Sequence, residues 1–137
     1  MERWDVIFKG LVTAGGAAAS FLFGGWSALL GILAAFVVAD YITGLMAAGV
    51  EKKLSSEVGL KGITKKVCIF ILVAAAYMVD KALGAAQLFR DATIFFYLAN
   101  ELLSIIENAG RIGLPVPDII GQAVVVLRGK SKDGGSQ

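Results

Sequence analysis

Residues 10–50 read GLVTAGGAAASFLFGGWSALLGILAAFVVADYITGLMAAGV, and this stretch holds a single charged residue, Asp40. A helix needs about 20 apolar residues to cross the hydrocarbon core of a bilayer, so the stretch suits two crossings better than one. Gly24 and Gly25 permit a tight turn, and Trp26 favours the membrane interface. We therefore expect spans at residues 6–23 and 27–50, with an interfacial or re-entrant first segment as the alternative.

The chain after this stretch supplies two more candidate spans. A basic connection at residues 51–66 precedes an apolar run at 67–84, and a fourth candidate covers 91–108. Two prolines, Pro115 and Pro117, then interrupt the pattern. We expect an all-α membrane protein, with a bundle of three to four transmembrane helices in residues 1–117. Residues 118–137 are expected to form a short amphipathic segment and a disordered basic tail.

The composition agrees with a membrane protein and excludes several other classes. Hydrophobic residues are 57% of the 137 residues and mean hydropathy is +0.75. With the 17 glycines the apolar share reaches roughly 69%, against about 45–50% in soluble domains. There is no His, Cys68 is the single cysteine, and motifs of hydrolases or nucleotide-binding enzymes are absent. We expect neither an enzyme nor a cofactor or metal site, and a net charge of +2 is too small to indicate nucleic-acid binding.

The distribution of Lys and Arg predicts the orientation in the membrane. With four spans, 11 of the 13 basic residues fall on one side, and only Lys81 and Arg90 fall on the other. With three spans the split is 9 to 4. Since cytoplasmic loops carry the excess of basic residues, both ends are expected in the cytoplasm in the four-span case. The connection 51–66 is expected there in either case.

Small residues in the first two spans are candidates for helix packing. Close approach of helices in lipid favours Gly, Ala and Ser spaced four apart, because no hydrophobic force brings the helices together. The candidates for such packing are Gly15, Gly16, Ala19 and Gly44. They serve either packing within one chain or contact between protomers. Asp40 and Thr43 share one side of the second span, where Asp40 faces either a protein partner or water.

The fourth candidate span has one apolar side and one polar stripe. The polar stripe contains the candidate pore-lining or oligomer-contact residues, which together with Asp40 and Thr43 are Tyr97, Asn100, Glu101, Ser104, Glu107 and Asn108. Asp40 and Glu101 have no basic residue at their own depth in the predicted spans. We therefore expect internal salt bridges not to satisfy both carboxylates, and water enclosed by an oligomer to hydrate them.

Several sequence blocks resemble the toxin-secretion and phage-lysis holins of Gram-positive phages and prophages. They are DYITG at 40–44, KKLSS at 52–56, GLKG at 59–62 and KK at 65–66, followed by IFFYLANE at 94–101, SIIENA at 104–109 and GLPVP at 113–117. The resemblance implies a multi-pass protein of the bacterial cytoplasmic membrane that forms homo-oligomers and opens lesions. The lesions release an endolysin or toxin, so endolysin is a functional partner without direct binding. The family has no catalytic residues.

The resemblance leaves two alternative functions open. An antiholin would delay lysis, and a small channel subunit would conduct ions without passing a folded enzyme. Contact with anionic lipid headgroups is a further expectation for the basic residues. These are Lys52, Lys53, Lys61, Lys65, Lys66, Arg128, Lys130 and Lys132. A solubilising tail is the alternative interpretation of the last three.

Overall fold

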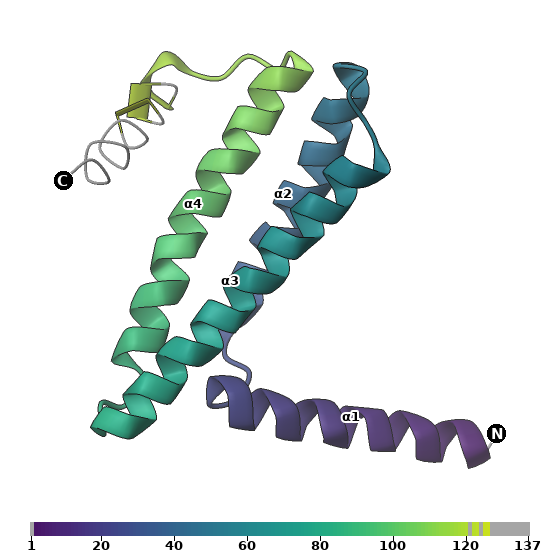
Figure 1. The fold of residues 1–137 in the computed structure, drawn as a ribbon, viewed down its shortest axis with the longest axis vertical. Helices are drawn as coiled ribbons and strands as arrows, with labels where there is room; N and C mark the ends of the chain where they lie inside the picture. The colour runs from purple at the N-terminus through teal and green to yellow at the C-terminus, as the bar shows by residue number, and fades with distance from the viewer. Residues whose placement is uncertain (1, 121, 124, 127–137) are drawn as a thin grey trace.

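The computed structural model describes residues 2–120, 122–123 and 125–126, and it confirms the all-α fold. Four long helices follow one another: α1 (Glu2–Phe23), α2 (Ala28–Val50), α3 (Ser56–Leu83) and α4 (Leu88–Ile112) (Figure 1). The described residues from 118 to 126 are also helical. The expected amphipathic segment thus lies partly within the described residues, whereas the basic tail from 128 onward lies outside them.

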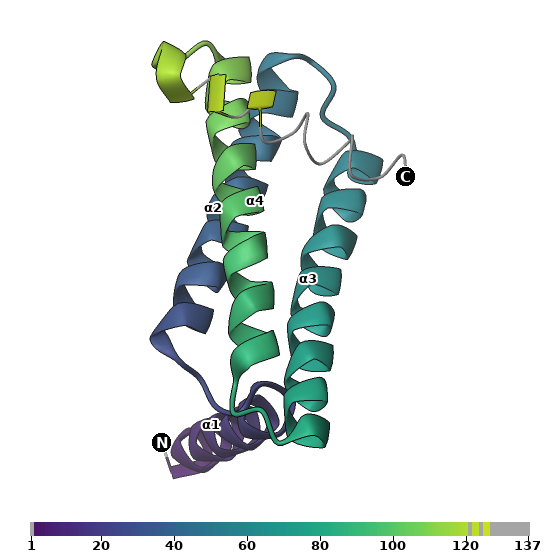
Figure 2. The ribbon, with the colours of Figure 1, turned by 90° about the vertical axis from the view of Figure 1, so that its left-hand side faces the viewer.

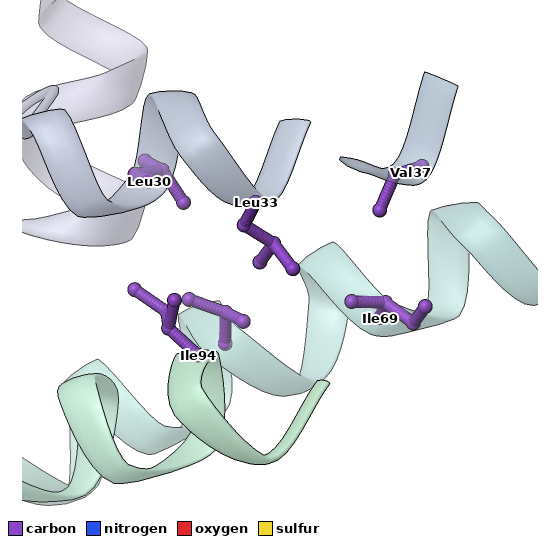
Figure 3. Close-up of a cluster of buried hydrophobic side chains, with 6 residues drawn as sticks. Leu30, Leu33, Val37, Ile69 and Ile94 are labelled. Carbon is purple, nitrogen blue, oxygen red and sulfur yellow. The ribbon is translucent and has the colours of Figure 1, made fainter. Parts of the chain in front are cut away.

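Helices α2, α3 and α4 form the bundle. Helix α4 packs along α2 and against α3, whereas α2 and α3 make only limited contact with each other (Figure 2). The apolar core lies where the three helices meet (Figure 3). The core residues are Leu30, Leu33, Val37, Ile69, Val73 and Ile94. Their side chains pack closely against one another, as in the interiors of other folded proteins.

Local capping explains where the bundle helices begin and end. The side chains of Ser27 and Ser55 accept hydrogen bonds from the Leu30 and Val58 amides, both at 3.2 Å, at the starts of α2 and α3. The last turns of α3 and α4 are closed by Gly84 and Gly113, whose backbones are left-handed with φ of 67° and 107°. Glycine adopts this conformation without a steric penalty, which makes it a common helix terminator.

Helix α3 is longer than expected. The sequence predicts a connection over residues 51–66, but the helix begins at Ser56, eleven residues before the predicted span at 67. The Ser55 cap and the absence of proline before Pro115 allow the helix to start within the basic segment. Lys61, Lys65 and Lys66 are therefore helical residues, and the span boundaries themselves stay a prediction.

Helix α1 does not return along α2 as a hairpin. The turn is at Gly24 and Gly25 as predicted, with φ of 77° and 103°, but α1 leaves it steeply inclined to the bundle (Figure 1). Only its last turn is packed, with the Phe23 ring edge-on to Phe70 of α3. No residue of α1 is buried, so the expected packing along a first hairpin is absent from this arrangement of the helices.

Three helices, α1, α2 and α3, are long and apolar enough to cross a membrane. Helix α4 has 25 residues, which exceeds the length of a span, but it carries Glu101, Glu107 and three charges near its ends. Such a helix is costly in lipid unless neighbouring helices cover its charges. The position of α4 against both α2 and α3 supplies that cover for Glu101, which is buried, but leaves Glu107 exposed.

Gly62 allows close contact between α2 and α3, and this generates a stability prediction. A Cβ atom added at Gly62 would lie 3.1 Å from the ring of Tyr41. The Tyr41 hydroxyl donates to the Gly59 carbonyl at 3.4 Å. We expect Gly62→Leu to lower the free energy of unfolding by about 1–3 kcal/mol through overpacking. Reversible unfolding in mixed micelles, followed by circular dichroism, measures the change.

The matched control is Gly49→Leu in α2. A Cβ atom there meets nothing within 4 Å, so this variant should be neutral or more stable, because leucine favours helix over glycine. Equal destabilisation of both variants contradicts the assigned contact.

Candidate functional site

A cluster of polar side chains, which we call the ionic cluster, joins the three bundle helices. It consists of Asp40 and Thr43 on α2, Lys66 on α3, and Glu101 and Asn108 on α4. The Lys66 ammonium donates to Asp40 Oδ2 and, at 2.7 Å, to Glu101 Oε2. One lysine therefore bridges two carboxylates from two different helices.

Asn108 completes the cluster on the other side of Asp40. Its amide nitrogen donates to Asp40 Oδ1 at 2.8 Å, to the Asp40 carbonyl at 3.2 Å and to Thr43 Oγ1 at 3.0 Å. Its amide oxygen accepts from Arg111 at 3.3 Å, and Arg111 also bonds to Glu51. A chain of polar contacts thus runs from the ionic cluster to the end of the bundle where α2 and α3 are connected.

Helical spacing brings these residues together. Asp40 and Thr43 are three apart on α2, and Glu101 and Asn108 are seven apart on α4, so each pair lies on one side of its helix. Lys66 lies ten residues into α3, and Asp40 lies ten residues before the end of α2. Both are about 15 Å along the helix axis from that connected end.

The ionic cluster corrects the expectation that internal salt bridges do not satisfy the two carboxylates. Lys66 was assigned to a connection outside the membrane, but α3 begins early enough to carry it to the depth of Asp40 and Glu101. The carboxylates therefore need no enclosed water in the single protomer. The argument for an oligomer that rested on unpaired carboxylates is wrong.

The cluster is buried on its carboxylate side and reachable on its lysine side. Asp40 is 7% exposed and Glu101 is 3% exposed, while the Lys66 side chain is 18% exposed. Lys66 borders a hollow of about 230 Å³ among the three helices and a groove of about 450 Å³ between α3 and α4. Across the described residues, no buried side-chain nitrogen or oxygen lacks a hydrogen-bond partner.

The predicted polar stripe on α4 divides into two sets. Glu101 and Asn108 face inward into the ionic cluster, together with Asp40 and Thr43 of α2. The remaining predicted residues are less covered: Tyr97 and Ser104 are half-buried, and Asn100 and Glu107 are exposed. The structure therefore does not bring all of the predicted pore-lining residues to one surface.

The predicted packing and membrane-surface residues also have different positions. A Cβ atom added at Gly44 would lie 3.5 Å from the Asn108 side chain, so Gly44 does allow close packing of α2 and α4. Gly15 and Gly16 meet nothing within 4 Å, and Ala19 is half-buried near the end of α1. Of the predicted membrane-surface residues that the structure describes, Lys52, Lys53, Lys61 and Lys65 are exposed, whereas Lys66 belongs to the ionic cluster. Arg128, Lys130 and Lys132 lie outside the described residues.

A second polar centre at the opposite end of the bundle was not predicted. The Asp80 carboxylate is buried and accepts from the Phe89 and Arg90 amides, both at 2.8 Å, at the start of α4. The Arg90 side chain is 3% exposed as a residue and donates to the Phe23 carbonyl at 2.8 Å. This centre holds the ends of α1, α3 and α4 together. An acidic residue late in α3 is not itself a sequence signal for capping the next helix.

Comparisons with known proteins identify the family of the chain. A family model described as the bacteriophage holin family matches residues 17–129. The uncharacterized protein BH0965 of Halalkalibacterium halodurans is 53% identical over 118 residues, covering 82% of this chain and 87% of its own. The uncharacterized protein Lin0175 of Listeria innocua is 46% identical, covering 94% and 92%. An uncharacterized 14.9 kDa protein of Clostridium perfringens is 37% identical, covering 93% of each chain. No solved structure matches.

The ionic cluster generates a prediction about Lys66. Lys66→Met keeps an unbranched side chain of similar size to the lysine hydrocarbon chain but leaves two carboxylates facing each other without a cation. Breaking a buried ion pair in this way typically costs about 3–5 kcal/mol, and we expect a loss of that size in the free energy of unfolding. Unfolding in mixed micelles measures it.

Two further variants make the test specific. Lys65→Met removes the neighbouring exposed charge and should change stability by at most about 0.5 kcal/mol. Neutralising the whole cluster, with Asp40→Asn and Glu101→Gln added to Lys66→Met, should recover part of the loss. The account is contradicted if Lys65→Met and Lys66→Met have the same effect.

Proposed function

Because this chain belongs to the bacteriophage holin family, whose members are non-enzymatic membrane proteins, we propose that it is a holin of the bacterial cytoplasmic membrane. Copies of the chain assemble in the membrane and open lesions through which an endolysin or toxin leaves the cytoplasm. The endolysin passes through the lesion and does not bind to the chain. The observation that carries the proposal is the division of polar residues on α4 between an internal cluster and an outward side.

The inward set of polar residues suits a protomer that accumulates in lipid without harm. Lys66 neutralises part of the charge of Asp40 and Glu101, and Asn108 donates a hydrogen bond to the other carboxylate oxygen of Asp40. Pairing and hydrogen bonding reduce the cost of holding charged groups at membrane depth. In this form the bundle exposes mainly apolar side chains, which suits a protein that waits in the membrane before opening.

The outward set suits the lining of a lesion. Tyr97, Asn100 and Ser104 lie along the groove between α3 and α4, next to Lys66 and Glu101. Polar groups inside a membrane favour either protein contacts or water. When copies gather with these grooves facing one another, the polar sides of α4 enclose water. The apolar side of each α4 stays against its own bundle and lipid.

The basic residues suit the orientation of a cytoplasmic-membrane protein. Lys52, Lys53 and Lys61 are exposed near the end of the bundle that connects α2 and α3, whereas the exposed Lys65 lies nine residues into α3, close to the level of Lys66. Placing that end in the cytoplasm follows the usual excess of basic residues on this side and brings Lys52, Lys53 and Lys61 to anionic headgroups.

Inducible expression in a bacterium, with and without a cytoplasmic endolysin, tests the proposal. A holin should cause an abrupt loss of viability without endolysin, and the culture should clear only when endolysin is present. Delayed lysis on co-expression with an active holin indicates an antiholin instead. A selective ion current without release of a cytoplasmic enzyme indicates a channel. Either of these two results contradicts the proposal.

A pair of variants on α4 tests whether residues of the α3–α4 groove line the lesion, apart from any effect on insertion of the chain into the membrane. Asn100→Leu removes an exposed polar group from the groove and should delay or abolish lysis while membrane levels, measured by immunoblot, stay unchanged. Phe96→Leu replaces a side chain that is 65% exposed and does not line that groove, so its lysis timing should be that of the parent chain. Unchanged timing in both variants contradicts the role of the groove.

A further inference from the structure

An apolar groove runs between α2 and α3 where the two helices make little contact. Its volume is about 250 Å³ and its lining residues are Val37, Val38, Tyr41, Ile63, Lys66, Val67 and Phe70. The surface that it exposes is apolar, so Lys66 contributes the hydrocarbon part of its side chain. Val38, Ile63 and Val67 are each about half exposed. The bundle therefore has an unfilled side that lies apart from the α3–α4 groove.

Helix α1 is the one long helix of the described chain without a packed face. It is 22 residues long, has the composition of a membrane span, and buries none of its residues. In Figure 1 it extends from the bundle on the side opposite α4. Its middle, residues 14–20, consists of Ala, Gly and Ser. A surface of small side chains fits a groove lined by larger ones, because the helix axes approach closely.

We infer that α1 of the same chain docks lengthwise in the α2–α3 groove, which converts the three-helix bundle into a four-helix bundle. One end of this interface is present in the structure. Phe23 at the end of α1 packs on Phe70 at the groove, with ring centroids 6.4 Å apart. The turn at residues 24–27 is short enough for an αα-hairpin. A tether of this length gives α1 an effective concentration on the order of mM at its own groove, which favours it over α1 of another copy.

Charges at the far end of the groove agree with this register. In the docked position α1 runs parallel to α3, with Phe23 beside Phe70. Counting back fourteen residues from both brings Lys9 beside Ser56, the first residue of α3, and next to Glu57. Opposite charges therefore meet at the open end of the groove. The attraction between Lys9 and Glu57 favours the docked helix over the extended one.

Docking also reconciles the two topologies left open by the Lys and Arg counts. With α1 extended, three bundle helices cross, and with α1 docked, four helices cross and the N-terminus lies on the side of the 51–55 connection. The docked form places 11 of the 13 basic residues on one side of the membrane. The inference concerns helix arrangement and stands whether or not the assembled chain opens lesions.

Disulfide trapping of the full chain in phosphatidylglycerol-containing vesicles tests this inference. In a Cys68→Ser background, Gly16→Cys is combined with Ile63→Cys, two positions that each lie seven residues before Phe23 and Phe70. A second pair, Ser20→Cys with Val67→Cys, reports on the next helical turn. The control pair joins Gly16→Cys to Leu102→Cys, an exposed position on α4, the helix that lies on the opposite side of the bundle from α1. Disulfides form only where Cα atoms come within about 7 Å.

Docking predicts that oxidation links both test pairs within one chain and leaves the control pair unlinked. The product migrates as a monomer on a non-reducing gel, and mass spectrometry identifies the linked peptides. Vesicles that mix copies carrying one cysteine each should give no linked dimer. Linked dimers from the mixed vesicles show that the groove takes the helix of another copy, and failure of both test pairs shows that lipid occupies it. Both results overturn the inference.

Discussion

The arrangement of this bundle depends on a single lysine held between two carboxylates. Lys66 of α3 contacts Asp40 of α2 and Glu101 of α4, so one ammonium group ties three helices at one level. The charges are costly in an apolar environment, and each helix lowers that cost only by staying next to the other two. The apolar core, which includes Leu33 and Val73, then packs between helices whose relative positions the ion pairs already fix.

The same constraint decides how α4 can exist in a membrane. Helix α4 is too polar for an independent span, whereas α2 and α3 are apolar enough to cross alone. Its inward Glu101 and Asn108 are paired with Lys66 and Asp40, respectively, and its outward polar groups line a groove. A helix that is stable in lipid only through its partners is a suitable element for a protein that is inert as a protomer and polar when assembled.

The sequence predicts much of the fold because the bilayer restricts the choices. Low charge from residue 10 to 50, a glycine pair and a polar stripe on α4 were sufficient for an all-α bundle and for its turns. The sequence pattern misplaces the start of α3, because a run of lysines is typical of a connection between spans, although the Ser55 cap allows a helix there. That error hid the partner of Asp40 and Glu101. The position of Asp80 at the start of α4 depends on tertiary packing, which a single sequence does not display.

The central claim is that Lys66 lies within the bundle at the depth of two carboxylates and not at the membrane surface. Solid-state NMR of the full chain in bilayers, with ¹⁵N in lysine and ¹³C in the Asp and Glu side chains, measures the distances from the Lys66 Nζ to the carboxylate carbons. The account predicts strong dipolar coupling of this nitrogen to both Asp40 and Glu101, lost in Lys66→Met. A Lys66 nitrogen without coupling to either carboxylate, and accessible to aqueous paramagnetic quenchers, would contradict it.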